Sequence, residues 1–173
     1  TEFGGLLKDS ACTFCGQCIQ TCPTGALGDL KALRHKEVEA PVEKTRSICT
    51  YCGVGCALDI MSKGDQIVGI QPAMDGPANE GALCVKGQFA FDFVHHPDRL
   101  KTRFFRVDQG LLVLATWDEA LDRAAAGLGD VVKKHGSHSL YAIASGRAPN
   151  EAGYLMQKFV RAGLGTSYID NCS

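Results

Sequence analysis

The sequence has almost no net charge and contains no long hydrophobic run. Its 18 Lys and Arg residues and 19 Asp and Glu residues give a formal net charge of -1. This balance gives no electrostatic reason to expect nucleic acid or an anionic membrane as a partner. No apolar run reaches roughly 18 residues, so we expect no membrane span in this chain. The N-terminus, Thr1–Gly5, is neither a Met start nor a signal peptide, which indicates a processed or internal start.

Cysteine is the residue that the sequence has in excess. Eight of the nine cysteines fall between Cys12 and Cys84, and the ninth is Cys172. An odd total in tight C-x-x-C spacing fits a secreted disulfide framework poorly and fits thiolate ligation of metal in a reducing compartment better. We therefore expect a cytoplasmic protein in which the first part of the chain is organised around metal centres.

The composition changes along the chain and separates four segments. Residues 1–33 are rich in Cys and Gly, and residues 34–46 are charged and contain a proline, as expected of a linker. Residues 47–103 hold the second cysteine group among short strands, and residues 104–173 alternate helix and strand. The predicted fold class is α+β in the first part and α/β in the last.

Local signals predict a hairpin and a long helix. The apolar runs Leu58–Met61 and Ile67–Ile70 flank Lys63–Gln66, which is a turn signal. Thr116 and Glu119 form a capping box at the start of a helix that Gly136 ends, and basic residues precede that glycine. The apolar face of this helix is predicted to be Leu121, Ala124, Ala125 and Leu128.

A strand, a helix and a second strand are predicted after Gly136. The strands are Leu140–Ala144 and Thr166–Ile169, and the helix between them is capped by Asn150. This order is the opening of a βαβ unit, so a parallel sheet is expected. Because one or two strands do not form a stable sheet, we expect the domain to continue past the end of the chain. The predicted apolar face of the second helix is Leu155, Met156, Phe159 and Val160.

The first cysteine motif has the spacing of a bacterial ferredoxin. Thiolates this close on a tight loop converge on one cubane, and Gly16 relieves crowding there. In two-cluster ferredoxins the three leading cysteines hold one cluster, and the fourth, followed by proline, reaches a neighbouring cluster. A structural zinc knuckle is the alternative, although zinc pairs usually stand further apart and do not require the Cys-Pro ending. The motif is Cys12-x2-Cys15-x2-Cys18-x3-Cys22-Pro23.

The second motif combines three local cysteines with one distant cysteine. Cys49-x2-Cys52-x3-Cys56 is followed, after 27 residues, by Cys84. Four such thiolates complete the ligand shell of a [4Fe–4S] cluster. A zinc ribbon is the alternative interpretation.

The two motifs together resemble a known family. Gly4–Ala11, together with Phe14–Cys18, looks like the second half of a two-cluster ferredoxin domain. Such domains precede the catalytic part of formate dehydrogenase alpha subunits, and a similar one occurs in the large iron–sulfur subunit of NADH:quinone oxidoreductase. The second motif resembles the N-terminal cluster motif of the molybdopterin oxidoreductases. The resemblance implies half of a ferredoxin-like domain, then a small [4Fe–4S] domain of short strands and helices, then the start of an α/β pterin-binding domain.

The resemblance also assigns roles to residues outside the cysteines. It implies that Lys86 relays electrons between cluster and pterin, where a solvated surface lysine is the alternative. A Gly–Arg turn before a helix N-terminus suits a phosphate group, although an ordinary βα loop would look the same. It further places the metal-ligating Cys or selenocysteine shortly beyond Ser173, so that Cys172 packs nearby without ligating. His95 and His96 are interpreted as structural. The implied cofactor-binding residues are Lys86, Arg147, Asn150 and Asn171.

The resemblance implies oxidation of formate to CO2, or the reverse, at a molybdenum or tungsten bis-molybdopterin guanine dinucleotide centre. The [4Fe–4S] clusters would pass electrons to NAD-, ferredoxin-, quinone- or hydrogenase-linked partner subunits. Three alternatives stay open. One is a molybdenum-free iron–sulfur subunit of an NADH dehydrogenase. Another is a molybdenum oxidoreductase for a different substrate such as nitrate, and the third is a metal-scaffolded binding module without redox activity.

Overall fold

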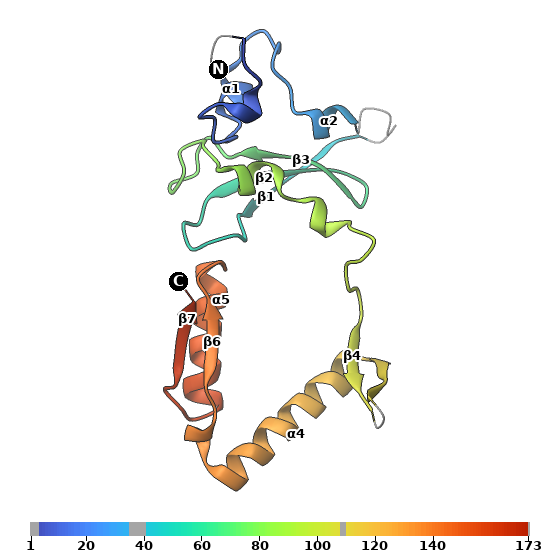
Figure 1. The fold of residues 1–173 in the computed structure, drawn as a ribbon, viewed down its shortest axis with the longest axis vertical. Coiled ribbons are helices and arrows are strands. Elements are labelled where there is room, and N and C mark those ends of the chain that lie inside the picture. The colour runs from blue at the N-terminus through green and yellow to red at the C-terminus, as the bar shows by residue number, and fades with distance from the viewer. Residues whose placement is uncertain (1–3, 35–40, 108–109, 173) are drawn as a thin grey trace. The chain divides into compact units, whose positions relative to one another are not determined.

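The computed structural model describes residues 4–34, 41–107 and 110–172, and it has a mixed α/β fold (Figure 1). It divides into two compact units, one of Thr1–His96 with Arg147–Pro149 and one of Pro97–Gly146 with Asn150–Ser173. Each unit is described separately below.

The elements of the first unit are η1 (Leu7–Asp9), α1 (Gln17–Thr21), α2 (Leu30–Arg34), β1 (Glu43–Ile48), β2 (Ala57–Lys63), β3 (Gln66–Pro72), α3 (Val85–Phe89) and η2 (Asp92–Val94). Those of the second unit are β4 (Arg103–Arg106), β5 (Leu112–Ala115), α4 (Trp117–His135), η4 (Ser137–Ser139), β6 (Ala142–Ser145), α5 (Asn150–Lys158), the π-helical turn η5 (Phe159–Gly163) and β7 (Ile169–Cys172).

The centre of the first unit is an antiparallel sheet in the order β1-β2-β3. The predicted hairpin is confirmed: β2 and β3 pair across a turn in which Gly64 has φ +54°, a conformation that glycine adopts without strain. The register shifts between Met61 and Ser62, where the ladder has an irregularity. The short strands expected between residues 47 and 103 are therefore present.

The hydrophobic core of the first unit packs against the second cysteine motif. Its buried side chains come from β2, β3, the end of β1 and the segment around α3. One cysteine of the motif is itself part of this core, so packing fixes where that thiol sits. The core residues are Cys49, Leu58, Ile70, Leu83 and Phe91.

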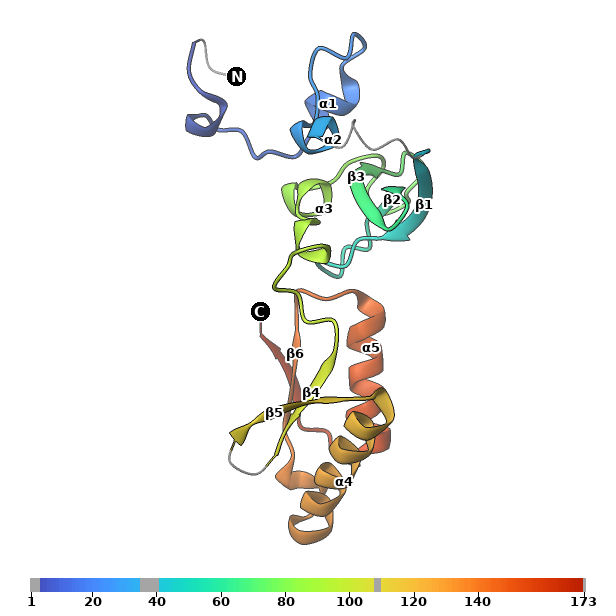
Figure 2. The same cartoon turned by 90° about the vertical axis from the view of Figure 1, so that its right-hand side faces the viewer.

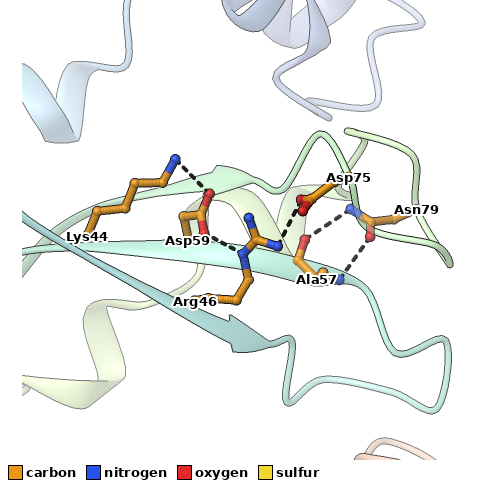
Figure 3. A network of polar contacts seen from close by, with 6 residues as sticks. All are labelled: Lys44, Arg46, Ala57, Asp59, Asp75 and Asn79. Carbon is orange, nitrogen blue, oxygen red and sulfur yellow. Dashed lines mark hydrogen bonds and ion pairs between the residues drawn. The ribbon is translucent and has the colours of Figure 1, made fainter.

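The expected linker 34–46 differs from the structure in its last part. Residues 43–46 are the first four of the six residues of β1, whereas residues 35–40 lie outside the described residues. The charged side chains of this strand are paired, because β2 and the loop after β3 supply carboxylates for them. Lys44 and Arg46 bond to Asp59, and Arg46 also bonds to Asp75 (Figure 3).

The second unit contains a hairpin followed by the long helix. β4 and β5 are antiparallel, with Arg103 opposite Ala115. The predicted capping box is confirmed at α4: the Thr116 hydroxyl accepts from the Glu119 backbone N–H, and the Glu119 carboxylate accepts from the Thr116 N–H. Hydrogen bonds from the Thr116 backbone N–H, and then from its hydroxyl, hold the pKa of Glu119 below its usual value. Gly136 ends the helix as predicted, with φ +80°.

The predicted βαβ unit is also confirmed, because β6 and β7 pair in parallel (Figure 2). Its strands are shifted from the predicted positions: β6 is Ala142–Ser145, and β7 is Ile169–Cys172. Thr166, predicted to open the second strand, is buried before it and has its backbone N–H bonded to the Val160 carbonyl. The apolar faces of both helices are largely open in this chain. Leu121 is 58% exposed and Leu155 is 61% exposed.

None of the helices in the described ranges is long and apolar enough to cross a membrane.

Candidate metal centres

A tight loop holds three cysteines of the second motif at one end of the sheet. β1 ends at Ile48 and β2 begins at Ala57, and these two residues pair across the ladder. The Cys49 backbone N–H donates to the Cys56 carbonyl at 2.8 Å, which closes the loop between the strands. Cys52 sits within that loop. The hairpin therefore places the three local thiols by its own backbone geometry.

Helix α3 brings the fourth cysteine to this loop. Cys84 is the N-cap residue of α3. One turn further, a Cβ at Gly87 would be 3.5 Å from Cys49 Sγ, an ordinary van der Waals distance, and 3.3 Å from Leu83 Cδ2. This part of α3 therefore lies against Cys49.

Cys56 interacts electrostatically with the other three cysteines of the motif. Burial raises the pKa of Cys56, and the negative charges of Cys49, Cys52 and Cys84 raise it further. Four thiolates gathered in this way repel each other unless a cationic group offsets their charge. This donor set fits an iron–sulfur cluster, which is held by four thiolates. In the part of the chain that the structure describes, no three Cys, His, Asp or Glu side chains are placed to hold a single metal ion.

Two residues that sequence reasoning missed fasten the loop. The Asn79 side chain accepts from the Ala57 backbone N–H at 2.8 Å and donates to the Ala57 carbonyl at 3.1 Å (Figure 3). It also donates to the Ala82 carbonyl at 2.8 Å, so it ties the end of the cysteine loop to the segment before Cys84. The Tyr51 hydroxyl donates to the Ala90 carbonyl, which joins the loop to the end of α3. No sequence motif indicates either contact, because the partners are far apart in the chain.

The first motif lies on a separate loop and short helix of the same unit. Phe14 and Gly16 both have positive φ, +54° and +79°, which turns the chain sharply between the first cysteines. The Phe14 backbone N–H donates to Cys12 Sγ at 3.3 Å. Cys18 is carried by α1, and Cys22 is the residue at which this helix ends. The loop thus presents thiols that are exposed or half-buried.

Cys22 has surroundings of its own. Its thiol lies 3.5 Å from Thr24 Oγ1. Hydrogen bonds from the Thr24 side chain, and then from backbone groups of Leu27, Thr24 and Ala26, lower the pKa of Cys22 to about 7. The groups that favour its thiolate are therefore the residues that follow it.

The other predicted site residues are spread over both units. Lys86 is on the exposed side of α3, and its carbonyl accepts the Ala90 N–H. Asn150 is the first residue of α5, and Asn171 lies opposite Ala144 at the carboxyl ends of the parallel strands. That edge is where ligands bind in open α/β sheets. Arg147 belongs to the connection grouped with the first unit.

His95, interpreted as structural, makes a contact between two elements of the first unit. His95 is the residue at which η2 ends, and its Nε2 accepts the Ile67 backbone N–H at 3.1 Å. This bond joins the end of η2 to the start of β3. The prediction for the Cys172 side chain lies outside the described side chains.

Three consecutive parts of the chain match known protein domains. Residues 8–28 match the "4Fe-4S binding domain", residues 42–96 match the "Molybdopterin oxidoreductase Fe4S4 domain", and residues 99–173 match the domain described as "Molybdopterin oxidoreductase". The chain thus carries two iron–sulfur domains followed by a molybdopterin oxidoreductase domain. The chain belongs to the molybdopterin oxidoreductase family.

Similar proteins carry names that specify a substrate. The chain is 34% identical over 204 residues to "Putative formate dehydrogenase SAR2393" of Staphylococcus aureus strain MRSA252, covering 96% of this chain and 21% of that protein. It is 33% identical, with the same coverage, to "Putative formate dehydrogenase SAB2186c" of the bovine strain RF122. The chain therefore spans about a fifth of the length of these relatives.

Proposed function

We propose that this chain is the electron-transferring part of a formate dehydrogenase catalytic subunit. The observation that carries the proposal is the position of the second motif, where the β1–β2 loop holds three cysteines and α3, which lies against Cys49, begins at the fourth. The chain matches the formate dehydrogenase relatives over 96% of its length. The reaction is the conversion of formate to CO2, a proton and two electrons, or its reverse. A molybdenum or tungsten bis-pterin centre, when bound, supplies the two-electron chemistry.

In this proposal each cysteine group has one task. Cys49, Cys52, Cys56 and Cys84 hold a [4Fe–4S] cluster that takes electrons one at a time. The first motif holds the next acceptor through Cys12, Cys15 and Cys18. Cys22 serves a neighbouring cluster, in the arrangement of a two-cluster ferredoxin domain. The separate surroundings of Cys22, whose thiol faces Thr24, agree with a separate task.

The remaining residues are proposed to bind or serve the pterin. Lys86 would carry a positive charge close to a reduced cluster and an anionic cofactor, which stabilises both. Arg147, Asn150 and Asn171 would bind the cofactor at the edge of the sheet where β6 and β7 end. Residues 47–103 then form the cluster domain, and residues 104–173 begin the pterin-binding domain. The 173 residues alone are proposed to lack formate dehydrogenase activity, because they span only 21% of the relatives.

The proposed partners follow from the direction of electron flow. Electrons that reach the first motif leave for a subunit linked to NAD, ferredoxin, quinone or hydrogenase. A cytoplasmic location agrees with the eight cysteines whose side chains the structure describes, all of them free thiols that a reducing compartment preserves.

The test is anaerobic purification of the full-length protein, with measurement of iron, molybdenum and tungsten and of formate-dependent dye reduction. We expect iron together with molybdenum or tungsten, and dye reduction that needs formate. If the protein reduces nitrate and does not oxidise formate, nitrate replaces formate as the proposed substrate. Iron without molybdenum or tungsten would indicate a molybdenum-free electron-transfer subunit, and stoichiometric zinc without iron would indicate a non-redox module.

A further inference from the structure

The loop of the first cysteine motif packs directly on helix α3. Gly16, between two cysteines of that motif, is buried and has φ +79°. A Cβ at Gly16 would lie 3.0 Å from Gln88 Cγ and 3.2 Å from Phe89 Cζ. An added side chain would therefore displace the Gln88 and Phe89 side chains by a few tenths of an ångström, and the positive φ would strain it as well. The first motif is therefore held against the helix that begins at Cys84.

The Gln88 side chain is buried and bonded to strand β3. Only 4% of this residue is exposed, and its side-chain N–H donates to the Ile70 carbonyl of β3 at 2.5 Å. Its neighbour Gly87 faces Cys49 Sγ of the second motif. Two consecutive residues of α3 thus contact the two cysteine groups, with Gly87 on one and Gln88 on the other.

Lys31 makes a second connection between the same segments. The Asp29 carboxylate accepts the Lys31 backbone N–H at 2.8 Å, which sets the start of α2. The Lys31 ammonium then bonds to the Phe89 carbonyl at 2.5 Å and to Asp92 Oδ2 at 2.6 Å, and it lies 5.0 Å from the centre of the Phe91 ring. Its side chain is 30% exposed, so these bonds are partly shielded from water.

We propose that Lys31 and Gln88 are positioning residues that fix the distance between the two iron–sulfur sites. This inference rests on the proposed function, which places a cluster at each cysteine group. Transfer of electrons between two sites requires that their separation is held by rigid packing. Helix α3 is the element that joins the two sites. Gln88 positions the first cysteine loop on α3, and Lys31 ties the segment after that loop to the C-terminal end of α3.

The experiment uses the full-length protein with its clusters, prepared anaerobically, and compares Lys31→Met with Lys31→Arg. Lys31→Met keeps the length and apolar stem of the side chain but removes the charged donor. Asp92→Asn, a nearly isosteric change at an exposed partner, weakens the same contact if Lys31→Met fails to fold. Lys8→Met is the matched control. Lys8 is exposed on the same segment and has no ion pair among the described residues, and its loss changes the charge equally.

Two measurements are made on each variant. The magnetic interaction between the two reduced clusters, seen as broadening or splitting in the EPR spectrum, reports their separation. Amide hydrogen exchange in α1 and α2 reports how often the segment leaves α3. In Lys31→Met we expect exchange there to speed up by about tenfold or more, because a hydrogen bond to a charged group is lost. We expect a weaker magnetic interaction with unchanged iron content, a spectrum closer to wild type in Lys31→Arg, and wild-type behaviour in Lys8→Met.

The result that overturns the inference is a Lys31→Met or Asp92→Asn protein with both clusters, unchanged magnetic interaction and unchanged exchange. That result leaves the proposed function intact. If the wild-type protein lacks a cluster at either of the two cysteine motifs, the cluster assignment in the proposed function fails, and the inference fails with it. Cluster content is measured before any variant is compared, so the two failures are distinguished.

Discussion

Arg46 and Asp59 face each other across the β1–β2 ladder, and the Arg46 guanidinium Nε lies 2.6 Å from Asp59 Oδ1. The Asp59 side chain is only 4% exposed, and Lys44 Nζ contacts its other oxygen at 2.9 Å. Arg46 extends the network to Asp75, which lies on the loop beyond β3 (Figure 3). Burying a carboxylate costs free energy. At Asp59 this cost is offset because both of its oxygens are paired with cations.

Acid is predicted to weaken the sheet through Asp59. The hydrogen bonds from Arg46, and then from Lys44, hold the pKa of Asp59 below its usual value. A carboxyl group with a lowered folded-state pKa stabilises the fold fully above its unfolded pKa, which is about 3.9. That contribution is lost as the pH falls through the folded-state pKa. Urea denaturation of wild type and Asp59→Asn, from pH 6 to pH 3, should show a difference in stability that shrinks below about pH 4.

Asp65→Asn is the control for this prediction, because Asp65 is exposed at the turn of the next hairpin. Its stability should follow wild type over the whole range. An Asp59→Asn protein as stable as wild type at pH 6 would show that the pairing with Arg46 and Lys44 adds nothing to the sheet.

Asn79→Ala is predicted to loosen the second cluster loop. The substitution removes three hydrogen bonds and takes the Asn79 amide away from the Ala57 N–H and the Ala82 carbonyl, whereas the Ala57 carbonyl keeps its bond from the Ala73 N–H. We expect a loss of about 2–4 kcal/mol in the free energy of unfolding, since each buried polar group left unpaired costs ~1–3 kcal/mol. Cys56 and Cys84 flank the segments that Asn79 joins, so iron should also dissociate faster.

Urea denaturation and the rate of iron release to a chelator measure these two effects. Gln66→Ala is the control, because Gln66 is exposed at the start of β3. If Asn79→Ala retains iron as long as wild type does, Asn79 does not position the cysteines.

Cys84→Ser is predicted to remove one cluster and spare the other. The four thiols around Cys56 include Cys84, whereas the first motif contributes no charge to the pKa of Cys56. In anaerobically purified protein, one cubane signal should be lost or altered in the EPR spectrum while the second persists. Cys172→Ser is the matched control and should keep both signals. Unchanged iron signals in Cys84→Ser would show that Cys84 is not a cluster ligand.

The elements that the sequence predicts correctly depend on local signals. The β2–β3 turn needs only Gly64 and its polar neighbours, and the start of α4 needs only Thr116 and Glu119. The boundaries of β6 and β7 are less local, because they depend on which residues pair across the sheet. The sequence therefore predicted the βαβ order but misplaced β7, whose start is Ile169.

Long-range pairing explains what the sequence did not reveal. β1 reads as a charged linker because the partners of Arg46 lie 13 and 29 residues away. Lys31 likewise reads as a surface lysine, since its partners Phe89 and Asp92 are 58 and 61 residues further along. The cysteines were recognisable because their spacing is itself the signal.

Lys86→Ala in the full-length protein is predicted to slow electron transfer more than formate binding. Lys86 follows the proposed ligand Cys84 by two residues and lies on the exposed side of α3, away from the buried Gly87 and Gln88. No thiolate is lost, so the cluster should remain intact. Reduction of that cluster should become harder, because a nearby cation favours the more negative state.

The measurement for Lys86 is pre-steady-state reduction of the iron–sulfur clusters by formate, with KM determined in parallel. We expect slower cluster reduction with little change in KM, because a role in electron relay does not involve holding the substrate. Lys86→Arg keeps the positive charge and should recover most of the rate, which separates a charge effect from lost packing. Lys101→Ala, a change at an exposed lysine outside the cluster domain's core, should behave as wild type. A large rise in KM with unchanged cluster reduction would instead make Lys86 a substrate-binding residue.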